Sequence, residues 1–218
     1  LLMPTQSAAI GITRGDLVMT LCRACDFVFN RAFDETRLSY SADYDNNQAH
    51  SGYFADYLES QARYLVETCG VRGCRIVEVG CGDASFLKRL VALDEGNLGF
   101  GFDPSYSCEA PLPERIKVEP RFYDEDCAEI VADVIVCRHV IEHVANPRVL
   151  LRSVRQALRN SPGARLFFET PDVSWILEGD VIWDLFYEHC SLFSPNSFAE
   201  LFEREGFRVL DIRTIFQG

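Results

Sequence analysis

A strand-to-helix connection built around two glycines constrains the fold of this chain more than any other feature. Residues 75–79 are rich in β-branched side chains, and Gly80-Cys81-Gly82 follows them directly. Apolar residues at positions 86, 87 and 90 then recur with helical spacing. Glycine lets a backbone turn sharply and come close to a ligand, because no Cβ is in the way. The pattern predicts a βα unit whose turn binds a ligand.

Strands and helices are expected to alternate along most of the chain. A helix is predicted from about residue 50 to Gly70. The last helix has clear boundaries, with Ser194 as N-cap, Pro195 in the first turn and Gly206 after the end. We predict strands at 75–79, 98–102, 115–119, 132–137, 164–169 and 207–215, and further helices at 84–93, 147–159 and 195–205. The alternation predicts an α/β fold with a doubly wound, mainly parallel Rossmann-like sheet and helices on both faces.

Acidic residues near the glycine turn distinguish between nucleotide-like ligands. A dinucleotide fingerprint needs a third glycine where this chain has Ser85, and Glu78 would repel a pyrophosphate. S-adenosylmethionine instead carries a sulfonium and an ammonium group, which an acid at a strand end favours. Asp103 ends the second strand, where a carboxylate accepts ribose hydroxyls. These residues favour S-adenosylmethionine over NAD. The alternative is an ordinary strand-to-helix turn.

The composition of the 218 residues limits the expected partners. The formal net charge is -12 at pH 7, opposite to the basic surface that nucleic-acid binding needs. No segment has the apolar length of a membrane span or the pattern of a secretory signal, so we expect a cytoplasmic protein with a small-molecule substrate. Nine cysteines, an odd number, fit reduced thiols better than a disulfide framework. The sequence at the two ends suggests that one or both natural termini are missing.

Several segments carry a resemblance to a known family. The run Val77-Glu-Val-Gly-Cys-Gly-Asp-Ala-Ser-Phe86, together with Asp103 and residues 132–143, resembles the class I S-adenosylmethionine-dependent methyltransferases. Residues 22–30, 44–51 and 187–194 resemble bacterial sugar C-methyltransferases with an N-terminal zinc-binding domain. The likeness therefore extends over nearly the whole chain.

The resemblance implies two domains. Residues 1–48 are then the remnant of the zinc-binding module with a linker, a short irregular extension, and residues 49–218 are the S-adenosylmethionine-binding methyltransferase domain. A closed structural zinc site needs about four ligands, and only Cys22 and Cys25 are present. Zinc is therefore expected only if further ligands lie upstream of this sequence.

The resemblance also implies a set of cofactor-binding residues. They belong to the glycine turn, to the ends of the following strands and to a segment that folds over the cofactor. The set comprises Glu78, Gly80, Cys81, Gly82, Asp103, Pro104, Asp124, Arg138, His139, Val140, Tyr44 and Gln48. For Asp124, which is expected near the adenine amino group, a solvated acid is an equal alternative. For Tyr44, packing against the first helix is an equal alternative.

The catalytic group is expected on the aromatic-rich loop 175–193, which can act as a lid. Methyl transfer from a sulfonium needs no acid for the leaving group, so the enzyme aligns the reactants and supplies a base. His189 is the first candidate for the base, and Tyr187 and Glu188, which precede it in the same motif, are the other catalytic candidates. The alternative for His189 is a histidine that anchors the loop through a backbone hydrogen bond. His143 is a further candidate, for which the alternative is a local group at the start of a helix, beside Glu142.

The expected activity is methyl transfer to a small molecule, by resemblance C-methylation of a nucleotide-linked keto sugar. One alternative keeps the enzyme class and methylates a hydroxyl of a sugar or another small metabolite. Two alternatives belong to other classes, an NAD-dependent oxidoreductase and a non-catalytic binding module. Ser85 and Glu78 disfavour the oxidoreductase.

Overall fold

The computed structural model describes residues 5–38, 51–107 and 111–216, which form two compact units. One unit, here called the sheet unit, comprises Asn46–Val140 and Arg152–Glu169. The other, here called the hairpin unit, comprises Leu1–Asp45, Ile141–Leu151 and Thr170–Gly218. Within the described ranges, no helix has both the length and the apolar character that crossing a bilayer requires.

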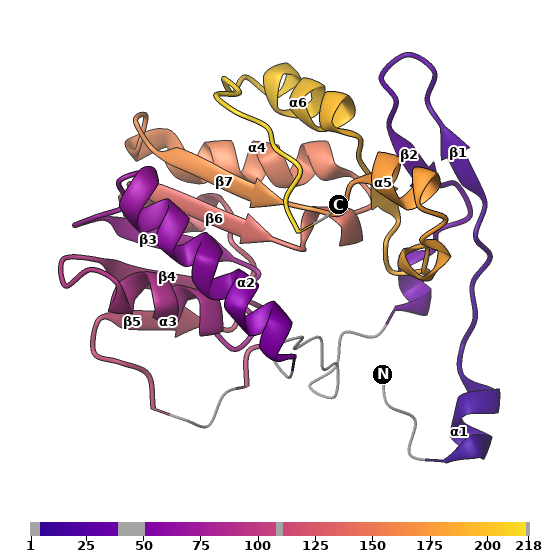
Figure 1. Ribbon diagram of the computed structural model, residues 1–218, viewed down its shortest axis with the longest axis horizontal. Helices are drawn as coiled ribbons and strands as arrows, with labels where there is room; N and C mark the ends of the chain where they lie inside the picture. Colours follow the sequence, from indigo (N-terminus) through magenta and orange to yellow (C-terminus); the bar gives the residue numbers. More distant parts are fainter. Residues whose placement is uncertain (1–4, 39–50, 108–110, 217–218) are drawn as a thin grey trace. The chain divides into compact units, whose positions relative to one another are not determined.

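The sheet unit contains a five-stranded parallel sheet with the order β5-β4-β3-β6-β7 (Figure 1). All four neighbouring pairs are parallel, so the carboxyl ends of the strands meet at one edge. The strands are β3 (Arg75–Val79), β4 (Leu98–Phe102), β5 (Ile116–Glu119), β6 (Val134–Arg138) and β7 (Arg165–Glu169). This order confirms the predicted doubly wound sheet, because the chain reverses its direction of growth at β3. Ligands of such sheets bind at this reversal point.

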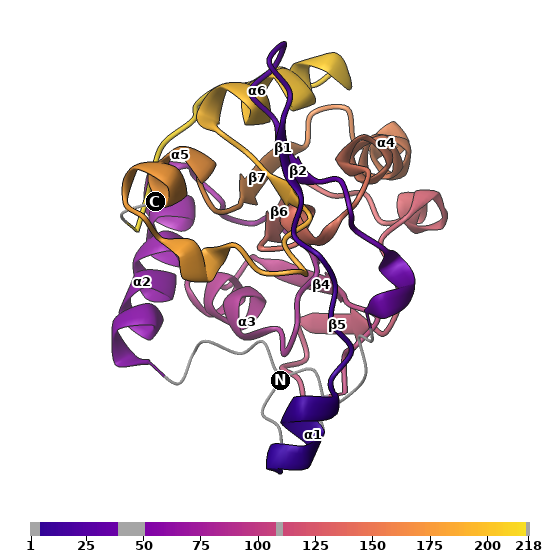
Figure 2. The same cartoon turned by 90° about the vertical axis from the view of Figure 1, so that its right-hand side faces the viewer.

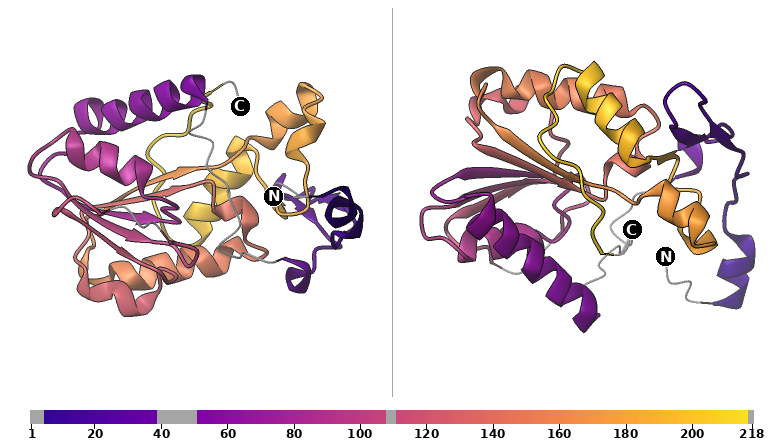
Figure 3. Two further views of the ribbon diagram at one scale, coloured as in Figure 1. Left: turned by 90° about the horizontal axis from the view of Figure 1, so that it is seen from below. Right: turned by 45° about the horizontal axis from the view of Figure 1, so that its top comes forward.

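Helices cover both faces of this sheet, as predicted (Figures 2 and 3). On one face α2 (Gly52–Arg63), which continues into the π-helical turn η2 (Tyr64–Thr68), packs beside α3 (Ser85–Ala92). On the other face lie residues 152–157 of α4 (Pro147–Ala157) with η5 (Leu158–Asn160) and η3 (Glu125–Glu129). The core between the layers is apolar, and its fully buried residues include Ala62, Ile76, Val77, Leu87, Leu90, Val134, Ile135 and Val154.

The hairpin unit is built on a small antiparallel sheet. Strands β1 (Met19–Leu21) and β2 (Val28–Asn30) form a hairpin, and β8 (Ser191–Leu192) pairs with β2. A small core lies between this sheet and α5 (Val173–Glu178) and consists of Val28, Val173, Ile176, Val181 and Leu192. Short helical segments complete the unit: α1 (Gln6–Gly11), η1 (Glu35–Arg37), η4 (Ile141–His143) and η6 (Ile182–Asp184). The other described residues of its N-terminal segment are irregular, as predicted.

The last helix, α6 (Pro195–Arg204), has the predicted boundaries. The hydroxyl of Ser194 accepts a hydrogen bond from the backbone N–H of Ser197, and the Ser197 hydroxyl accepts one from the backbone N–H of Ser194. This reciprocal capping box fixes the start of the helix. Gly206 follows its end with a φ of +85°, a conformation that glycine adopts without strain.

The strand predicted at 207–215 is wrong. These residues alternate in hydrophobicity, but they form no ladder with any other residue that the structure describes. Leu210 is 70% exposed and Ile212 is 39% exposed, so the apolar positions are not covered as strand residues of a sheet would be. An alternating pattern favours a strand only when a neighbour supplies backbone partners.

Candidate functional site

The glycine turn lies at the carboxyl end of β3. Gly80 and Gly82 have φ values of +69° and +53°. A Cβ on Gly80 would lie 2.2 Å from Cγ2 of Val140, whereas a Cβ on Gly82 would meet no atom within 4 Å. Packing therefore requires glycine at position 80, and the backbone at Gly82 faces open space. Such an open backbone at the reversal point of a parallel sheet suits a ligand that must approach closely.

Asp103 follows β4 directly and links the glycine turn to the end of the neighbouring strand. Its Oδ2 accepts a hydrogen bond from the Gly82 N–H at 2.9 Å. Its Oδ1 accepts from the backbone N–H of Ser105 at 2.8 Å and from the Ser105 hydroxyl at 2.6 Å. A carboxylate has about four acceptor positions, so these contacts occupy most of them. A ribose that binds Asp103 through both hydroxyls must therefore share or replace part of the contact with Ser105. Pro104, between the two residues, is exposed.

Two buried residues, Glu78 in β3 and Cys81 within the turn itself, complete this region. Glu78 is only 3% exposed, and its Oε2 accepts a hydrogen bond from the backbone N–H of Leu87 at 3.1 Å. Burial raises the pKa of Glu78 to about 8, against the opposing charge of Arg138. The carboxyl group is therefore mostly neutral at pH 7 in the ligand-free chain. The attraction for a cation that the sequence predicts arises only when a bound cation favours the ionised carboxylate. Burial, with the nearby acids, also raises the pKa of the Cys81 thiol far above its ordinary value.

Glu169, at the carboxyl end of β7, connects three other residues of the sheet unit. Its Oε2 accepts from Nε of Arg138 at 2.6 Å, and its Oε1 contacts Nε2 of His139 at 3.1 Å. The hydroxyl of Tyr57 donates to Oε1 as well. Burial by itself would raise the pKa of Glu169, but the hydrogen bond with His139 and the charge of Arg138 hold it well below its usual range. Glu169 is thus an ionised, largely buried anchor.

Arg138 and His139 are held in place at the end of β6. The Arg138 guanidinium carbon lies 4.4 Å from the centre of the Phe86 ring, a cation–π contact with the first turn of α3. His139 has a φ of +52°, and its N–H donates to the Glu169 carbonyl at 2.9 Å. Non-glycine residues in this conformation are strained and concentrate at functional sites. Sequence reasoning missed Glu169 and Tyr57, although Glu169 ends its strand as an acid much as Asp103 follows β4.

Three of the other predicted cofactor residues are Asp124, Tyr44 and Gln48, and the structure describes only the first of them. Asp124 caps η3, and its Oδ1 accepts from Nη2 of Arg121 at 2.6 Å and from the Asp126 N–H at 3.1 Å. Its side chain is 44% exposed, so it also matches the solvated acid considered above. Tyr44 and Gln48 lie outside the described residues.

The Tyr187-Glu188-His189 motif belongs to the hairpin unit. The Tyr187 hydroxyl accepts a hydrogen bond from the Asp34 N–H at 2.8 Å, and its ring packs against Phe33. Glu188 is half-buried. His189 is 8% exposed, and its Nδ1 lies 3.2 Å from the Asp184 carbonyl oxygen. A carbonyl can only accept, so this contact puts a proton on Nδ1 and the lone pair of the neutral ring on Nε2. The loop anchor considered for His189 is therefore present.

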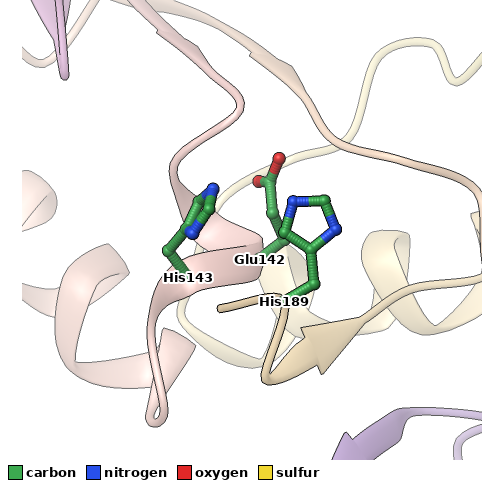
Figure 4. Close-up of side chains that lie close together, drawn as sticks. All are labelled: Glu142, His143 and His189. Carbon is green, nitrogen blue, oxygen red and sulfur yellow. The ribbon is translucent and has the colours of Figure 1, made fainter. Parts of the chain in front are cut away.

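His189 lies next to two residues of η4, Glu142 and His143 (Figure 4). Each of the three side chains offers one metal-ligating atom, and these atoms lie within 4.8 Å of one another. The two imidazole rings meet edge to face, with their centres 4.8 Å apart. Sequence reasoning considered both histidines but not Glu142.

Cys22 and Cys25 are free thiols in the turn between β1 and β2. Hydrogen bonds from the backbone of Ala24 and from Cys25 lower the pKa of Cys22. Two thiols are half of the ligand set that a closed zinc site needs. The pair by itself does not fit such a site.

Comparison with known proteins gives a consistent result. Residues 36–212 match the family described as a methyltransferase domain. The chain is 24% identical over 221 residues to C-methyltransferase NovU of Streptomyces niveus, a match that covers 98% of this chain and 51% of that protein. It is 30% identical over 128 residues to a ubiquinone biosynthesis O-methyltransferase of Escherichia coli O7:K1, covering 52% of this chain and 51% of that protein.

Among solved structures, an S-adenosylmethionine dependent methyltransferase from Mesorhizobium loti has a TM-score of 0.52 and 20% sequence identity. The alignment covers 71% of this chain and 84% of that chain, and at this identity it shows the fold. The chain spans about half the length of the curated relatives it matches. Because the family match extends over most of the residues, from 36 to 212, the chain belongs to the methyltransferase domain family.

Proposed function

We propose that the chain binds S-adenosylmethionine at the glycine turn and transfers its methyl group to a small molecule. The main support is the arrangement at the reversal point of the sheet, where the Gly82 N–H is fixed by Asp103 and its backbone faces open space. The family match supports the same cofactor. S-adenosylmethionine supplies a methyl group that its sulfonium makes electrophilic. The residues of this chain hold and orient that group.

The cofactor-binding residues divide into four roles in this proposal. Gly80 and Gly82 let the backbone approach, and Asp103 accepts the ribose hydroxyls in place of part of its contact with Ser105. Arg138 ends β6, His139 and Val140 follow it, and Glu169 fixes the first two for the methionine part. Glu78 and Cys81 shape the turn through their buried side chains. Pro104, Asp124, Tyr44 and Gln48 stay sequence-based proposals.

The acceptor is proposed to be a nucleotide-linked keto sugar that is methylated on carbon. This choice is supported by the similarity to C-methyltransferase NovU over nearly the whole chain. Methylation of a hydroxyl is the second candidate, supported by the higher identity to the ubiquinone biosynthesis O-methyltransferase over a shorter stretch. The cytoplasmic location is likewise a proposal.

His189 is proposed to accept the proton that the acceptor must lose before it is methylated. Its support is the tautomer, because a proton on Nδ1 makes Nε2 the basic nitrogen of the neutral ring. The contacts of Tyr187 with Asp34 and Phe33 position this loop. Glu188 is proposed to assist His189 from the neighbouring position.

Product analysis tests the proposal. The chain is incubated with S-adenosylmethionine carrying a 13C-methyl group and with candidate keto sugars and their hydroxyl analogues. A methyl on carbon and a methyl on oxygen differ strongly in carbon chemical shift. We expect a C-methyl product, with turnover reduced at least about tenfold in His189→Ala and adenosylhomocysteine binding unchanged. An O-methyl product selects the second candidate, and full turnover in the variant contradicts the role of His189.

A further inference from the structure

Three metal-ligating side chains gather in the hairpin unit outside the proposed cofactor residues. Among the residues that the structure describes, Glu142, His143 and His189 each place one ligand atom within 4.8 Å of the other two. Figure 4 shows the Glu142 carboxylate between the two imidazole rings in that view. We propose that these side chains form a binding site for a divalent transition-metal ion of the Zn2+ type. The proposal goes beyond methyl transfer and does not depend on it.

The types of ligand support a transition metal. Imidazole nitrogen suits zinc, iron, nickel and copper, and a carboxylate is a common third ligand in sites that keep a position open. Ions such as Mg2+ prefer oxygen ligands and retain several waters. The ligand atoms around a tetrahedral Zn2+ lie about 3.4 Å apart. The present spacing therefore requires a shift of about 1 Å or somewhat more, within reach of side-chain rotation.

The two segments that carry the ligands are fastened to each other. The Ser191 hydroxyl donates to the Val144 carbonyl at 2.7 Å, and the Cys190 thiol contacts the Glu142 carbonyl at 3.6 Å. These contacts link β8 and the residue before it to η4. A site built from segments that the fold already holds together loses little entropy when an ion binds.

Outer contacts orient at least two of the ligands. Nδ1 of His189 donates to the Asp184 carbonyl, which directs the lone pair to Nε2 as metal-bound histidines require. The Thr170 hydroxyl donates to Oε2 of Glu142 at 3.3 Å. Such partners fix the ring tautomer and the carboxylate direction in metal sites.

Burial adds a reason for a cation at this place. Glu142 is 0% exposed and His189 is 8% exposed. A buried carboxylate is costly to ionise unless positive charge is close. A divalent ion among the three ligands would be one source of that charge. A proton and a metal ion compete for the same lone pair on Nε2 of His189. His189 can therefore act as the base proposed above in the metal-free chain, but not in the chain that has bound a metal ion.

Metal binding to the metal-free chain tests the proposal. Calorimetry with Zn2+ and absorption spectroscopy with Co2+ are applied to the native chain, to His143→Gln and to Glu142→Gln. We expect one ion at this site in the native chain and at least a 100-fold loss of affinity in both variants. The Co2+ spectrum at this site should lack the intense charge-transfer band of thiolate ligands. Mg2+ should not displace Zn2+.

Control variants separate this site from the thiols. Cys22→Ser with Cys25→Ser should leave the Zn2+ affinity of the cluster unchanged, and Thr170→Val should weaken it about 10- to 100-fold through the outer contact. Circular dichroism checks that each variant folds. If Glu142→Gln does not fold, His143→Gln decides, since His143 is only half-buried. Unchanged Zn2+ affinity in a folded His143→Gln chain, or loss of binding in the cysteine variant, overturns the proposal. Neither result bears on adenosylhomocysteine binding.

Discussion

Glu169 accepts hydrogen bonds or ion-pair contacts from Tyr57 in α2 and from Arg138 and His139 at the end of β6. The side chains of Arg138 and Glu169 are only 11% and 15% exposed. A buried guanidinium that loses its carboxylate partner is left as an uncompensated charge. The order at the carboxyl end of β6 therefore depends on the Glu169 carboxylate as well as on the backbone pairing with β7.

Glu169→Gln should lower the free energy of unfolding by about 3–5 kcal/mol, because the amide keeps the shape but not the charge that balances Arg138. Urea unfolding followed by circular dichroism measures this change. Asp133→Asn is a matched control, since the Arg75–Asp133 pair is 42% and 41% exposed. Its loss should cost at most about 1 kcal/mol. Equal costs for the two variants would show that the Glu169 pair is not a special anchor.

Glu78 predicts a pH dependence of stability. Its pKa is raised from 4.5 to about 8 in the folded chain. The folded state then binds more protons than the unfolded state between these values, so this residue's contribution to stability is complete below pH 4.5. It is lost as the pH rises to 8, with a slope of at most about 1.4 kcal/mol per pH unit.

Glu78→Gln cannot titrate, so its stability relative to the native chain should rise between pH 5 and pH 8. Urea unfolding at each pH unit measures the difference, and the exposed Glu114 changed to Gln serves as the control. A constant difference between the Glu78 variant and the native chain over this range would contradict the burial-driven pKa.

The sequence predicted those residues whose signal is local. Gly80, Gly82 and Asp103 stand in or directly after predicted strands, and the structure places all three at the carboxyl ends of β3 and β4. Glu169 was missed because its partners lie 31, 30 and 112 residues away in the chain. No spacing rule connects such residues before the sheet order is known.

The turn between β3 and α3 has two glycines with different requirements. Both have positive φ, but only Gly80 is also confined by a neighbour, because a Cβ added there would lie 2.2 Å from Cγ2 of Val140. A positive φ alone costs a residue with a Cβ about 1–2 kcal/mol. The steric conflict should add to this cost at Gly80.

Gly80→Ala should therefore destabilise the chain by at least about 1 kcal/mol more than Gly82→Ala. In a Val140→Ala background, the cost of Gly80→Ala should fall to that of Gly82→Ala, because the opposing methyl group is gone. A double-mutant cycle measured by urea unfolding gives this coupling. A coupling energy near zero would mean that the turn relaxes away from Val140.

The sequence predicted the boundaries of the last helix better than it predicted the strands of the hairpin unit. The start of α6 was predicted correctly because Ser194 and Ser197 cap it through contacts three residues apart. The strand predicted at 207–215 was wrong because a strand depends on a partner, and its alternating residues find none in the described part of the chain. The two-residue strand β8 was missed for the same reason, since pairing with β2 defines it.

The whole chain combines a confirmed fold with proposals of increasing detail. The five-stranded parallel sheet and the match over residues 36–212 establish the methyltransferase domain family. The predicted domain boundary at residue 48 stays a prediction. The chain spans about half of its curated relatives, so the acceptor and the complete activity are proposals for the protein that contains it.

Calorimetric titration with adenosylhomocysteine tests the cofactor site most directly. The native chain should bind one equivalent, and Asp103→Ala should bind about 10- to 100-fold more weakly, as loss of hydrogen bonds to a charged acceptor implies. Ser105→Ala, which removes only a hydroxyl that donates to Asp103, should bind at least as tightly as the native chain. Absence of binding to the folded native chain, or equal affinity in Asp103→Ala, would contradict a cofactor site at the glycine turn.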